Sequence, residues 1–455
     1  MLKKVALIAC LLFGFAMLFG QIPSTAGWYQ IPNTALTSVC ACTQGFPNVC
    51  AVQGCPGIFD WGGGSFDTKR NRLIIWGGGH NDYFGNELYA LSLDSLNIRR
   101  ITDPGSTPVT YGYQTCPEAI ANGTQPNSRH TYDGLAYMEH IDRMFIFGGA
   151  LACGYGYTGR DTWTFDFATN TWHRMTSSGT LPASNYGVVC DYDPNTRKVF
   201  LHDNNAFYSY SFESDSYTKL ADNNISYHMT SVIDPKRKKF IVFGSGASSD
   251  AYIYDIGGNN YAGSPFVTTG ATGILGLQYP GLAYDPDRDR IVAWIGGNTV
   301  YSLNMDTRVW TADTFSGGPG LANVSGTFKR WRYSAKDGVF IVANRYDNNI
   351  QNGYTFRFPS TGTETSRPRQ VVGKISLSPN PATSSTIVRI SAEVVSRSPL
   401  QQVAVYGLGG RKMANLKKVS AGEFRWDGSG VPAGIYLVEA TVGNHRMIQK
   451  LTLMK

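Results

Sequence analysis

Histidine, arginine and tyrosine side chains recur beside apolar β-segments of this chain, in a combination that suits proton transfer on an acidic sugar. β-Elimination from a uronate requires a cation that neutralises the carboxylate, a base for the C5 proton and an acid for the leaving oxygen. His130 or His80 is expected to be the base and Tyr186 the acid. Arg129 and Arg332 are expected to neutralise the carboxylate. These side chains need no metal, so a polysaccharide-lyase-like site without metal ligands is one prediction.

A second set of side chains occupies the same ends of these segments and is suited to hold a sugar. The set consists of Asn81, Tyr132, His228, Tyr279 and Arg330. Tyrosine rings pack on sugar rings, whereas asparagine, histidine and arginine donate hydrogen bonds to hydroxyl or carboxylate oxygens. Each side chain also has a structural interpretation, because histidines bond loop backbone, arginines pair with carboxylates and tyrosines fill channels. No cofactor is expected, with copper or a structural metal left open.

The elements that must position these residues belong to a repeated hairpin. Each copy has an aromatic or apolar residue, a turn such as Asp-Pro-x-x, a basic or polar step, and an apolar run ending near Gly or Asn. The copies are 66–79, 137–149, 192–204, 233–245, 284–297 and 333–344. A repeat of ~40–50 residues indicates a propeller or a solenoid. Runs rich in Val, Ile, Phe and Trp without helical periodicity indicate that each unit is a small antiparallel sheet.

Outer strands are predicted between these hairpins, at 88–94, 162–172, 251–255 and 300–310. They complete four strands per sheet. The last copy lacks a fourth strand, and the N-terminal segment 27–32, which contains Trp28, is predicted to supply it and close the ring. In such a sheet the start of the innermost strand and the loop after the second strand lie on one face. The candidate residues named above are therefore expected to share one mouth of the ring.

Glycine doublets after apolar strands, with a tryptophan downstream, resemble the kelch-type propeller family. The doublets occur at 77–79, 148–149 and 296–297, and the resemblance covers about residues 27–358. Three copies depart from the pattern, with Asp203-Asn204, Gly244-Ser245 and Ala343-Asn344 in place of the doublet. The expected fold is an all-β, six-bladed kelch-like β-propeller, with seven blades left open, followed by a small Ig-like β-sandwich.

Some ulvan and related uronate lyases are propellers with His/Tyr/Arg sites, and this chain resembles them in architecture and residue type only. Two alternatives to a lyase remain open. Tyr227-His228 resembles the Tyr-His pair of copper radical oxidases of the galactose-oxidase type, which are also kelch propellers. That chemistry requires a tyrosine cross-linked to a cysteine, and the cysteines nearest the mouth, Cys116 and Cys153, are expected in disulfides. The other alternative is a propeller that binds glycan or protein without catalysis, so whether the chain is an enzyme stays open.

Cysteine usage and the N-terminus both indicate export. Lys3 and Lys4 precede an apolar run from 5 to 19 and the small residues 24–26, which suits a signal peptide cleaved before Gly27. Six of the seven cysteines beyond it lie in loop-like segments and are expected to form disulfides of undetermined pairing. Cys190 ends an apolar run and is expected to be a buried free thiol.

The basic charge of the chain is confined to its end. The formal net charge is +7, and the last 84 residues hold 11 Lys/Arg against 4 Asp/Glu, which accounts for the whole excess. A nucleic-acid partner needs a basic face on the recognition domain, so none is expected. No span is expected to remain in the membrane after signal removal, since 15 apolar residues fall short of the ~20 that a helix needs to cross.

The end of the chain resembles the C-terminal sorting domain of type IX secretion cargo. The matching elements are 377–381 (LSPNP), 403–410, 422–426, 432–436 (PAGIY) and the basic residues Lys450 and Lys455. The resemblance implies handling by the type IX secretion machinery and a location outside the cell or on its surface. The expected organisation is a signal peptide at 1–26, a propeller at 27–358, a linker at 359–371 and a sorting sandwich at 372–455. We expect a monomer with polysaccharide as its partner.

Overall fold

The computed structural model describes residues 21–105, 116–153, 157–183, 185–345, 352–360, 375–390, 400–407, 411–420, 422–442 and 445–455. The chain divides into two compact units, Met1–Glu364 and Thr365–Lys455. Most of the expected signal peptide and linker therefore lies outside the described residues. Within the described residues there is no α-helix, and no helix is long and apolar enough to cross a membrane.

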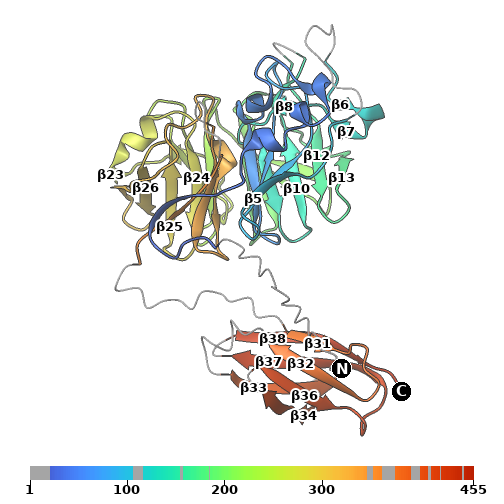
Figure 1. The fold of residues 1–455 in the computed structure, drawn as a ribbon. Helices are drawn as coiled ribbons and strands as arrows, with labels where there is room; N and C mark the ends of the chain where they lie inside the picture. Colours follow the sequence, from blue (N-terminus) through green and yellow to red (C-terminus); the bar gives the residue numbers. More distant parts are fainter. Residues whose placement is uncertain are drawn as a thin grey trace, which may run out of the picture. The chain divides into compact units, whose positions relative to one another are not determined.

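Six sheets, each built on four antiparallel strands, make up most of the described part of the larger unit, and two of them carry a short fifth strand that pairs in parallel (Figure 1). The first sheet contains β2 (Gly63–Asp67), β3 (Arg72–Trp76), β4 (Tyr89–Ser92) and β5 (Asn97–Arg100). The second contains β9 (Leu135–Met138), β10 (Arg143–Phe147), β12 (Thr162–Asp166) and β13 (Thr171–Arg174). The third contains β15 (Val189–Asp193), β16 (Lys198–His202), β17 (Ala206–Ser211) and β18 (Ser216–Asp222). The fourth contains β19 (Thr230–Asp234), β20 (Lys239–Phe243), β21 (Tyr252–Asp255) and β22 (Ser264–Pro265). The fifth contains β24 (Gly281–Asp285), β25 (Arg290–Trp294), β26 (Thr299–Asn304) and β27 (Val309–Thr314). The sixth contains β28 (Trp331–Ser334), β29 (Val339–Ala343), β30 (Gly353–Arg357) and β1 (Gly27–Gln30).

These sheets form a closed ring, which is the arrangement of a β-propeller. The innermost strands contact one another in the cycle β2, β9, β15, β19, β24, β28 and back to β2. The fourth strand of the last sheet comes from the N-terminus, because β1 pairs antiparallel with β30 and Trp28 lies opposite Phe356. In Figure 1 this dark-blue segment runs beside the orange end of the same unit. The predicted closure of the last sheet by the N-terminal strand is confirmed.

Short elements complete this unit. Strand β8 (Arg129–His130) pairs with β11 (Ala150–Leu151). The remaining short strands are β6 (Ala119–Ile120), β7 (Gln125–Pro126), β14 (Ser178–Gly179) and β23 (Thr269–Gly270). The 3-10 helices are η1 (Leu36–Ser38), η2 (Ala41–Thr43), η3 (Pro47–Val49), η4 (Cys55–Phe59), η5 (Ala121–Gly123), η6 (Thr272–Gly276) and η7 (Phe328–Arg330).

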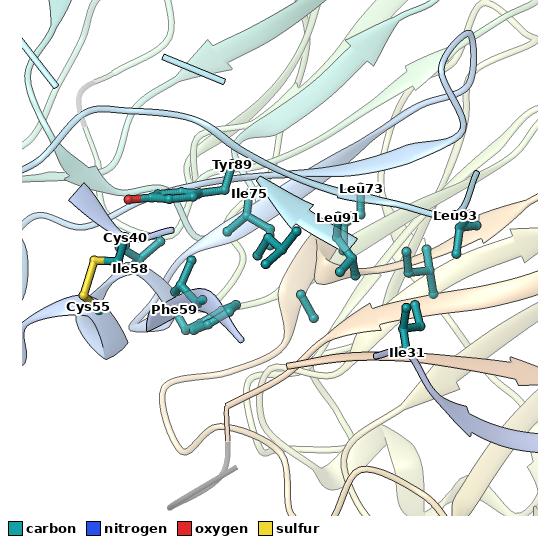
Figure 2. Packing of buried hydrophobic residues seen from close by; sticks show 14 of the residues in the cluster. Ile31, Cys40, Cys55, Ile58, Phe59, Leu73, Ile75, Tyr89, Leu91 and Leu93 are labelled. Carbon is teal, nitrogen blue, oxygen red and sulfur yellow. A yellow bond between two sulfur atoms is a disulfide. The ribbon is translucent and has the colours of Figure 1, made fainter. Parts of the chain in front are cut away.

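The hydrophobic core of the larger unit lies between neighbouring sheets. The side chains of the first sheet pack against those of the last, so that Leu73, Ile75 and Leu91 meet Ile341 and Val339. Figure 2 shows Ile31, just after β1, at the end of this row, near Leu93. Successive side chains of a central strand point alternately to the two neighbouring sheets. Because both sides are buried, these strands are nearly continuous apolar runs in the sequence.

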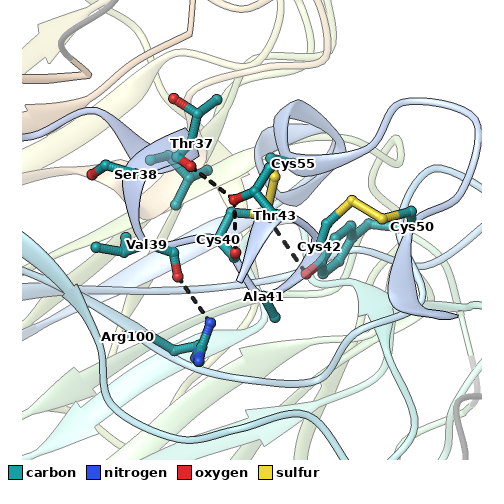
Figure 3. Close-up of a disulfide and its surroundings, with 12 residues drawn as sticks. Thr37, Ser38, Val39, Cys40, Ala41, Cys42, Thr43, Cys50, Cys55 and Arg100 are labelled. Carbon is teal, nitrogen blue, oxygen red and sulfur yellow. Dashed lines mark hydrogen bonds between the residues drawn. A yellow bond between two sulfur atoms is a disulfide. The ribbon is translucent and has the colours of Figure 1, made fainter. Parts of the chain in front are cut away.

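Three disulfides cross-link irregular segments of the larger unit. The pairs are Cys40–Cys55, Cys42–Cys50 and Cys116–Cys153, and Cys190 is buried and free. The prediction of six bonded cysteines and one buried thiol is confirmed, and the structure supplies the pairing. Figure 3 shows the two N-terminal bonds side by side, with Arg100 donating to the Val39 carbonyl oxygen at 3.1 Å. Two of these bonds cross-link the N-terminal segment within itself, and the third joins the residues before Ala119 to those after Leu151.

The smaller unit is a two-sheet β-sandwich, as predicted. One sheet contains β31 (Ile375–Ser378), β32 (Ser385–Ile390), β36 (Glu423–Asp427) and β35 (Lys417–Ser420); the other contains β34 (Lys412–Asn415), β33 (Leu400–Gly407), β37 (Gly434–Val442) and β38 (His445–Leu453). Val388 and Trp426 of the first sheet pack with Val405, Val438 and Leu451 of the second.

Candidate functional site

One end of the propeller channel is closed by a set of rings that stand at equivalent points of five sheets. Each ring belongs to the residue two or three positions before an innermost strand, and each has a left-handed backbone. The five are Trp61 (φ 49°), Tyr132 (φ 47°), His228 (φ 63°), Tyr279 (φ 57°) and Phe328 (φ 48°). Bulky residues rarely adopt positive φ, and such strain concentrates at functional sites. We call this set the ring floor.

Members of the ring floor contact one another across the channel. The His228 imidazole stacks on Trp61 at 4.4 Å between ring centroids and on Tyr132 at 5.0 Å. Tyr279 lies 5.1 Å from Trp61 and stacks on Phe328 at 5.7 Å. Since Tyr132 and Phe328 are buried while Trp61, His228 and Tyr279 are half-buried, the floor presents ring surface to solvent at the mouth.

The third sheet has no ring at the equivalent point, because the residue there is Gly187. Its φ is +63°, and a Cβ on it would lie 2.5 Å from the backbone nitrogen of His228. The neighbouring Tyr186 is half-buried and packs against the cluster of Tyr132 and Phe328. The mouth is therefore asymmetric, with a phenol beside the one position that lacks a ring of its own.

A histidine pair with a carboxylate lies beside the ring floor. His130 Nε2 is 2.8 Å from the Asp82 carboxylate, and the His80 and His130 rings are perpendicular with centroids 5.3 Å apart. His130 is 1% exposed, and its Nδ1 has no hydrogen-bond partner among the described residues. A carboxylate on one imidazole nitrogen fixes the orientation of the ring, which is the arrangement of a general base. Sequence reasoning missed Asp82 as a site residue, although it follows His80 and Asn81 in the same loop.

Two glycines allow His130 to reach this position. A Cβ on Gly79 would lie 2.5 Å from the backbone nitrogen of His130, and a Cβ on Gly149 would lie 2.2 Å from its carbonyl oxygen. Both glycines have positive φ. The glycine doublets after the second strands thus make room for β8, which passes between two sheets and carries His130 to the mouth. Asn81, also in a left-handed conformation, is tied to the same strand pair because its backbone nitrogen donates to the Ala152 carbonyl oxygen at 3.1 Å.

Burial lowers the pKa of two imidazoles at the mouth. Burial, with His130 nearby, lowers the pKa of His228 to about 4. Burial and His130 likewise lower the pKa of His80, against the opposing effect of Asp82. Burial raises the pKa of Tyr132, so that phenol remains a hydrogen-bond donor. At neutral pH the imidazoles of His80 and His228 are therefore neutral.

Exposed apolar surface continues the site outward at Tyr227. This side chain is 57% exposed, and its ring centroid lies 4.0 Å from that of His228. Sequence reasoning missed both Tyr227 and Trp61 as binding residues. The signal for Trp61 was available, since it occupies the same position relative to its strand as His228 and Tyr279 do.

Two predicted arginines are structural, which corrects their assignment to the mouth. Arg129 is fully buried, and its Nη1 donates to Asp161 at 2.8 Å and to the Gly148 carbonyl oxygen at 3.3 Å. Arg330 is fully buried and donates to the carbonyl oxygens of Gly62, Ala343, Phe59 and Gly326. Burial lowers the pKa of Arg330 to about 9. Both guanidinium groups spend their donors inside the protein, so neither is available to a ligand.

The third predicted arginine lies toward the other end of the channel. Arg332 is in the middle of β28, and it lines a cavity formed by the ends of the innermost strands and the hairpin turns that follow them. The prediction assumed that residues near the start of a strand share its mouth. Arg332 instead lies within β28, two residues beyond Arg330, and its side chain is directed into the channel further from the mouth.

The donors expected for a copper radical site are not assembled here. Cys116 and Cys153 bond to each other, and Cys190 is buried beside Asp133. Among the residues that the structure describes, no group of three or more His, Cys, Asp or Glu could hold a metal ion. His228, the histidine of the Tyr-His pair, is stacked between two rings. These residues do not fit the tyrosine–cysteine copper centre that the resemblance implied.

Comparison with known proteins identifies the class of the smaller unit. Residues 376–454 match the family described as the secretion system C-terminal sorting domain. The protein is accordingly handled by the type IX secretion machinery and is secreted or attached to the cell surface. No curated protein sequence matches the chain.

Similar solved structures include a structural genomics protein of unknown function from Bacteroides thetaiotaomicron VPI-5482, with 10% identity, a TM-score of 0.42, and coverage of 73% of this chain and 76% of that one. A nidogen/laminin complex has 12% identity, a TM-score of 0.37, and coverage of 58% and 82%. The structure of YjhT has 10% identity, a TM-score of 0.40, and coverage of 86% and 97%. These values carry no argument about activity.

Proposed function

We propose that the protein is a kelch-type propeller that binds carbohydrate at the cell surface through the mouth above the ring floor. The observation that carries this proposal is the cluster of half-buried rings, Trp61, His228 and Tyr279, with the exposed ring of Tyr227 beside them. Aromatic faces offer large contact area at low cost in side-chain entropy. Rings held by one another and by strained backbone are ordered before the ligand arrives, which lowers the cost of binding.

The ligand of this mouth is a neutral part of a glycan. Neutral imidazoles and amides donate to and accept from hydroxyl groups. A uronate, by contrast, requires a cation near its carboxylate. Of the two arginines predicted for that role, Arg129 is buried in the fold and Arg332 is directed to the other end of the channel. The acidic-sugar prediction therefore loses the residues that motivated it.

Proton transfer on the bound sugar is the second candidate function, favoured by the His130–Asp82 pair. With His130 as base and Tyr186 as acid, a lyase that takes a uronate at this mouth, in place of a neutral glycan, would release unsaturated sugar with a rise in ultraviolet absorbance. His130→Ala would abolish that signal while Tyr227→Ala would weaken binding. A binding protein without catalysis leaves the chain length of the glycan unchanged.

The binding proposal is tested with glycan affinity gels and calorimetry on a panel of neutral polysaccharides. Tyr227→Ala removes an exposed ring without opening the core. We expect its affinity to fall about three- to tenfold, the equivalent of ~0.5–1.5 kcal/mol of stacking. The matched control is Tyr261→Ala, which removes a half-buried tyrosine packed against the fourth sheet. Equal affinity of both variants and the wild type, or no glycan bound by the wild type, would refute the proposal.

A further inference from the structure

The cavity that contains Arg332 is a second, separate feature of the propeller channel. It has a volume of about 180 Å³ and is lined by residues of all six innermost strands and their hairpins. It lies at the end opposite the ring floor, because its lining residues come from the ends of those strands, such as Tyr192, Tyr284 and Tyr333.

A buried charge network separates this cavity from the mouth. Lys329 Nζ donates to the Ser231 carbonyl oxygen at 2.9 Å and lies 3.4 Å from Asp133 and 3.5 Å from Asp191. Asp133 in turn accepts from Thr230 Oγ1 at 2.9 Å. Lys329 and Asp133 directly follow the ring-floor residues Phe328 and Tyr132, whereas Asp191 lines the cavity itself. The network therefore occupies the channel between its two ends.

The floor of the cavity carries one donor group and one acceptor group side by side. Arg332 Nη2 donates to Asp191 Oδ1 at 3.2 Å, while Arg332 Nη1 has no hydrogen-bond partner among the described residues. Burial acts to raise the pKa of Asp191, but Lys329 and Arg332 outweigh it and keep this group ionised. A guanidinium beside a carboxylate offers N–H donors and oxygen acceptors to the same ligand edge, which matches adjacent hydroxyl groups.

The walls of the cavity are aromatic faces held in place by their own hydroxyl groups. Tyr284 Oη donates to Asp289 at 2.7 Å, Tyr333 Oη donates to Asp287 at 2.6 Å, and Tyr192 Oη lies 2.9 Å from His140 Nδ1. Because each phenol oxygen is engaged at the hairpin turns, ring surface is what remains for a ligand. The rings are ordered without the ligand, as at the mouth.

From these features we propose that the cavity is a binding site for a single neutral sugar ring. Its volume is below the ~300–1,000 Å³ of sites that hold drug-sized ligands, so it admits one ring and not a chain. Aromatic walls take the faces of the ring, and the Arg332–Asp191 pair takes two hydroxyl groups. An acidic sugar is disfavoured, because Asp191 and Glu139 both line the cavity.

The test is calorimetry and ligand-observed NMR on the full chain with neutral monosaccharides and uronic acids as separate arms. Arg332→Met removes the donor and leaves Asp191 paired with Lys329. We expect the affinity for the neutral sugar to fall about tenfold or more, as for loss of a hydrogen bond to a charged group. Thr68→Trp fills the cavity entrance from an exposed position without touching the buried network, and we expect it to abolish binding.

Tyr227→Ala, at the mouth, is the control and is expected to leave this site unchanged. Tyr227→Ala tests the mouth alone, whereas Arg332→Met and Thr68→Trp test the cavity alone. The mouth proposal can therefore fail without affecting the result at the cavity. The cavity proposal is overturned if no monosaccharide binds the wild type, if both cavity variants bind as the wild type does, or if a uronic acid binds more tightly than the neutral sugars.

Discussion

His228 occupies a position that four of the other sheets give to Trp, Tyr or Phe, and the reason lies in its surroundings. Its imidazole is stacked between Trp61 and Tyr132, where burial lowers its pKa to about 4. A neutral imidazole behaves there as an aromatic ring with a polar edge. At the residue scale the mouth is thus an apolar surface with a few polar edges, in contrast to the cationic pocket that the arginines suggested.

The lowered pKa of His228 predicts a pH dependence of stability. The unfolded histidine, with a pKa near 6.5, takes up a proton before the folded one does at about 4. The unfolded state therefore binds more protons in this window, and the free energy of unfolding falls as pH drops from 6.5 towards 4. His228→Phe keeps the ring, which Phe328 shows to be compatible with this backbone, and removes the titration. Thermal unfolding across the window should show a shallower loss in the variant.

The exposed His173 supplies the control for this measurement. His173→Phe should retain the wild-type pH dependence, with His130 and the other groups of the mouth unchanged. An identical slope for His228→Phe and the wild type would contradict the assignment.

At the scale of elements, the hairpin repeat predicts the sheets but not the insertion between them. The four-stranded units follow from alternating apolar runs and turn residues, and they occur where the repeat places them. Strand β8 has only two residues and no apolar pattern. Its position depends on Gly79 and Gly149, whose missing side chains leave room for the backbone around His130.

Gly149→Ala should therefore lower stability and displace His130. A left-handed alanine costs about 1–2 kcal/mol, and the Cβ would in addition lie 2.2 Å from the His130 carbonyl oxygen. Gly297→Ala is the matched control, because its φ is +67° and no atom lies within 4 Å of the added Cβ. Chemical denaturation should give a larger loss for Gly149→Ala than for Gly297→Ala. Equal losses would mean that the close approach to β8 does not constrain the fold.

At the scale of the whole molecule, the ring is closed by a strand from the other end of the domain. Trp28 on β1 packs against Phe356 at 5.0 Å, Trp331 at 5.8 Å and Trp294 at 5.9 Å between ring centroids. It joins the last two sheets across the seam. Pairing of β1 with β30 also removes an open strand edge, which a protein exposed outside the cell would otherwise present for aggregation.

Trp28→Ala should loosen this seam. Replacing a fully buried tryptophan with alanine costs ~3–5 kcal/mol of unfolding free energy. Because Trp28 is half-buried, we expect a loss somewhat below that range. Limited proteolysis should then release the N-terminal segment before the rest of the propeller is cut. Trp172→Ala removes a half-buried tryptophan from the outermost strand of an uninterrupted sheet and should not expose that segment. Early cleavage in both variants would argue against a special role for the seam.

The sequence by itself determined the repeated sheets of this protein, their order and the compartment in which it works. Apolar alternation, turn residues, cysteines in loop segments and the spaced motifs of the sorting module are local patterns, and local patterns decide strands, hairpins and export. Only the tertiary structure decided which side chains share a site. Arg129 and His130 are adjacent in the chain, yet alternation along a strand buries one against Asp161 and brings the other to Asp82. Arg332 lies at the opposite end of the channel for the same reason, since the direction of a side chain depends on strand register and on its neighbours across the ring.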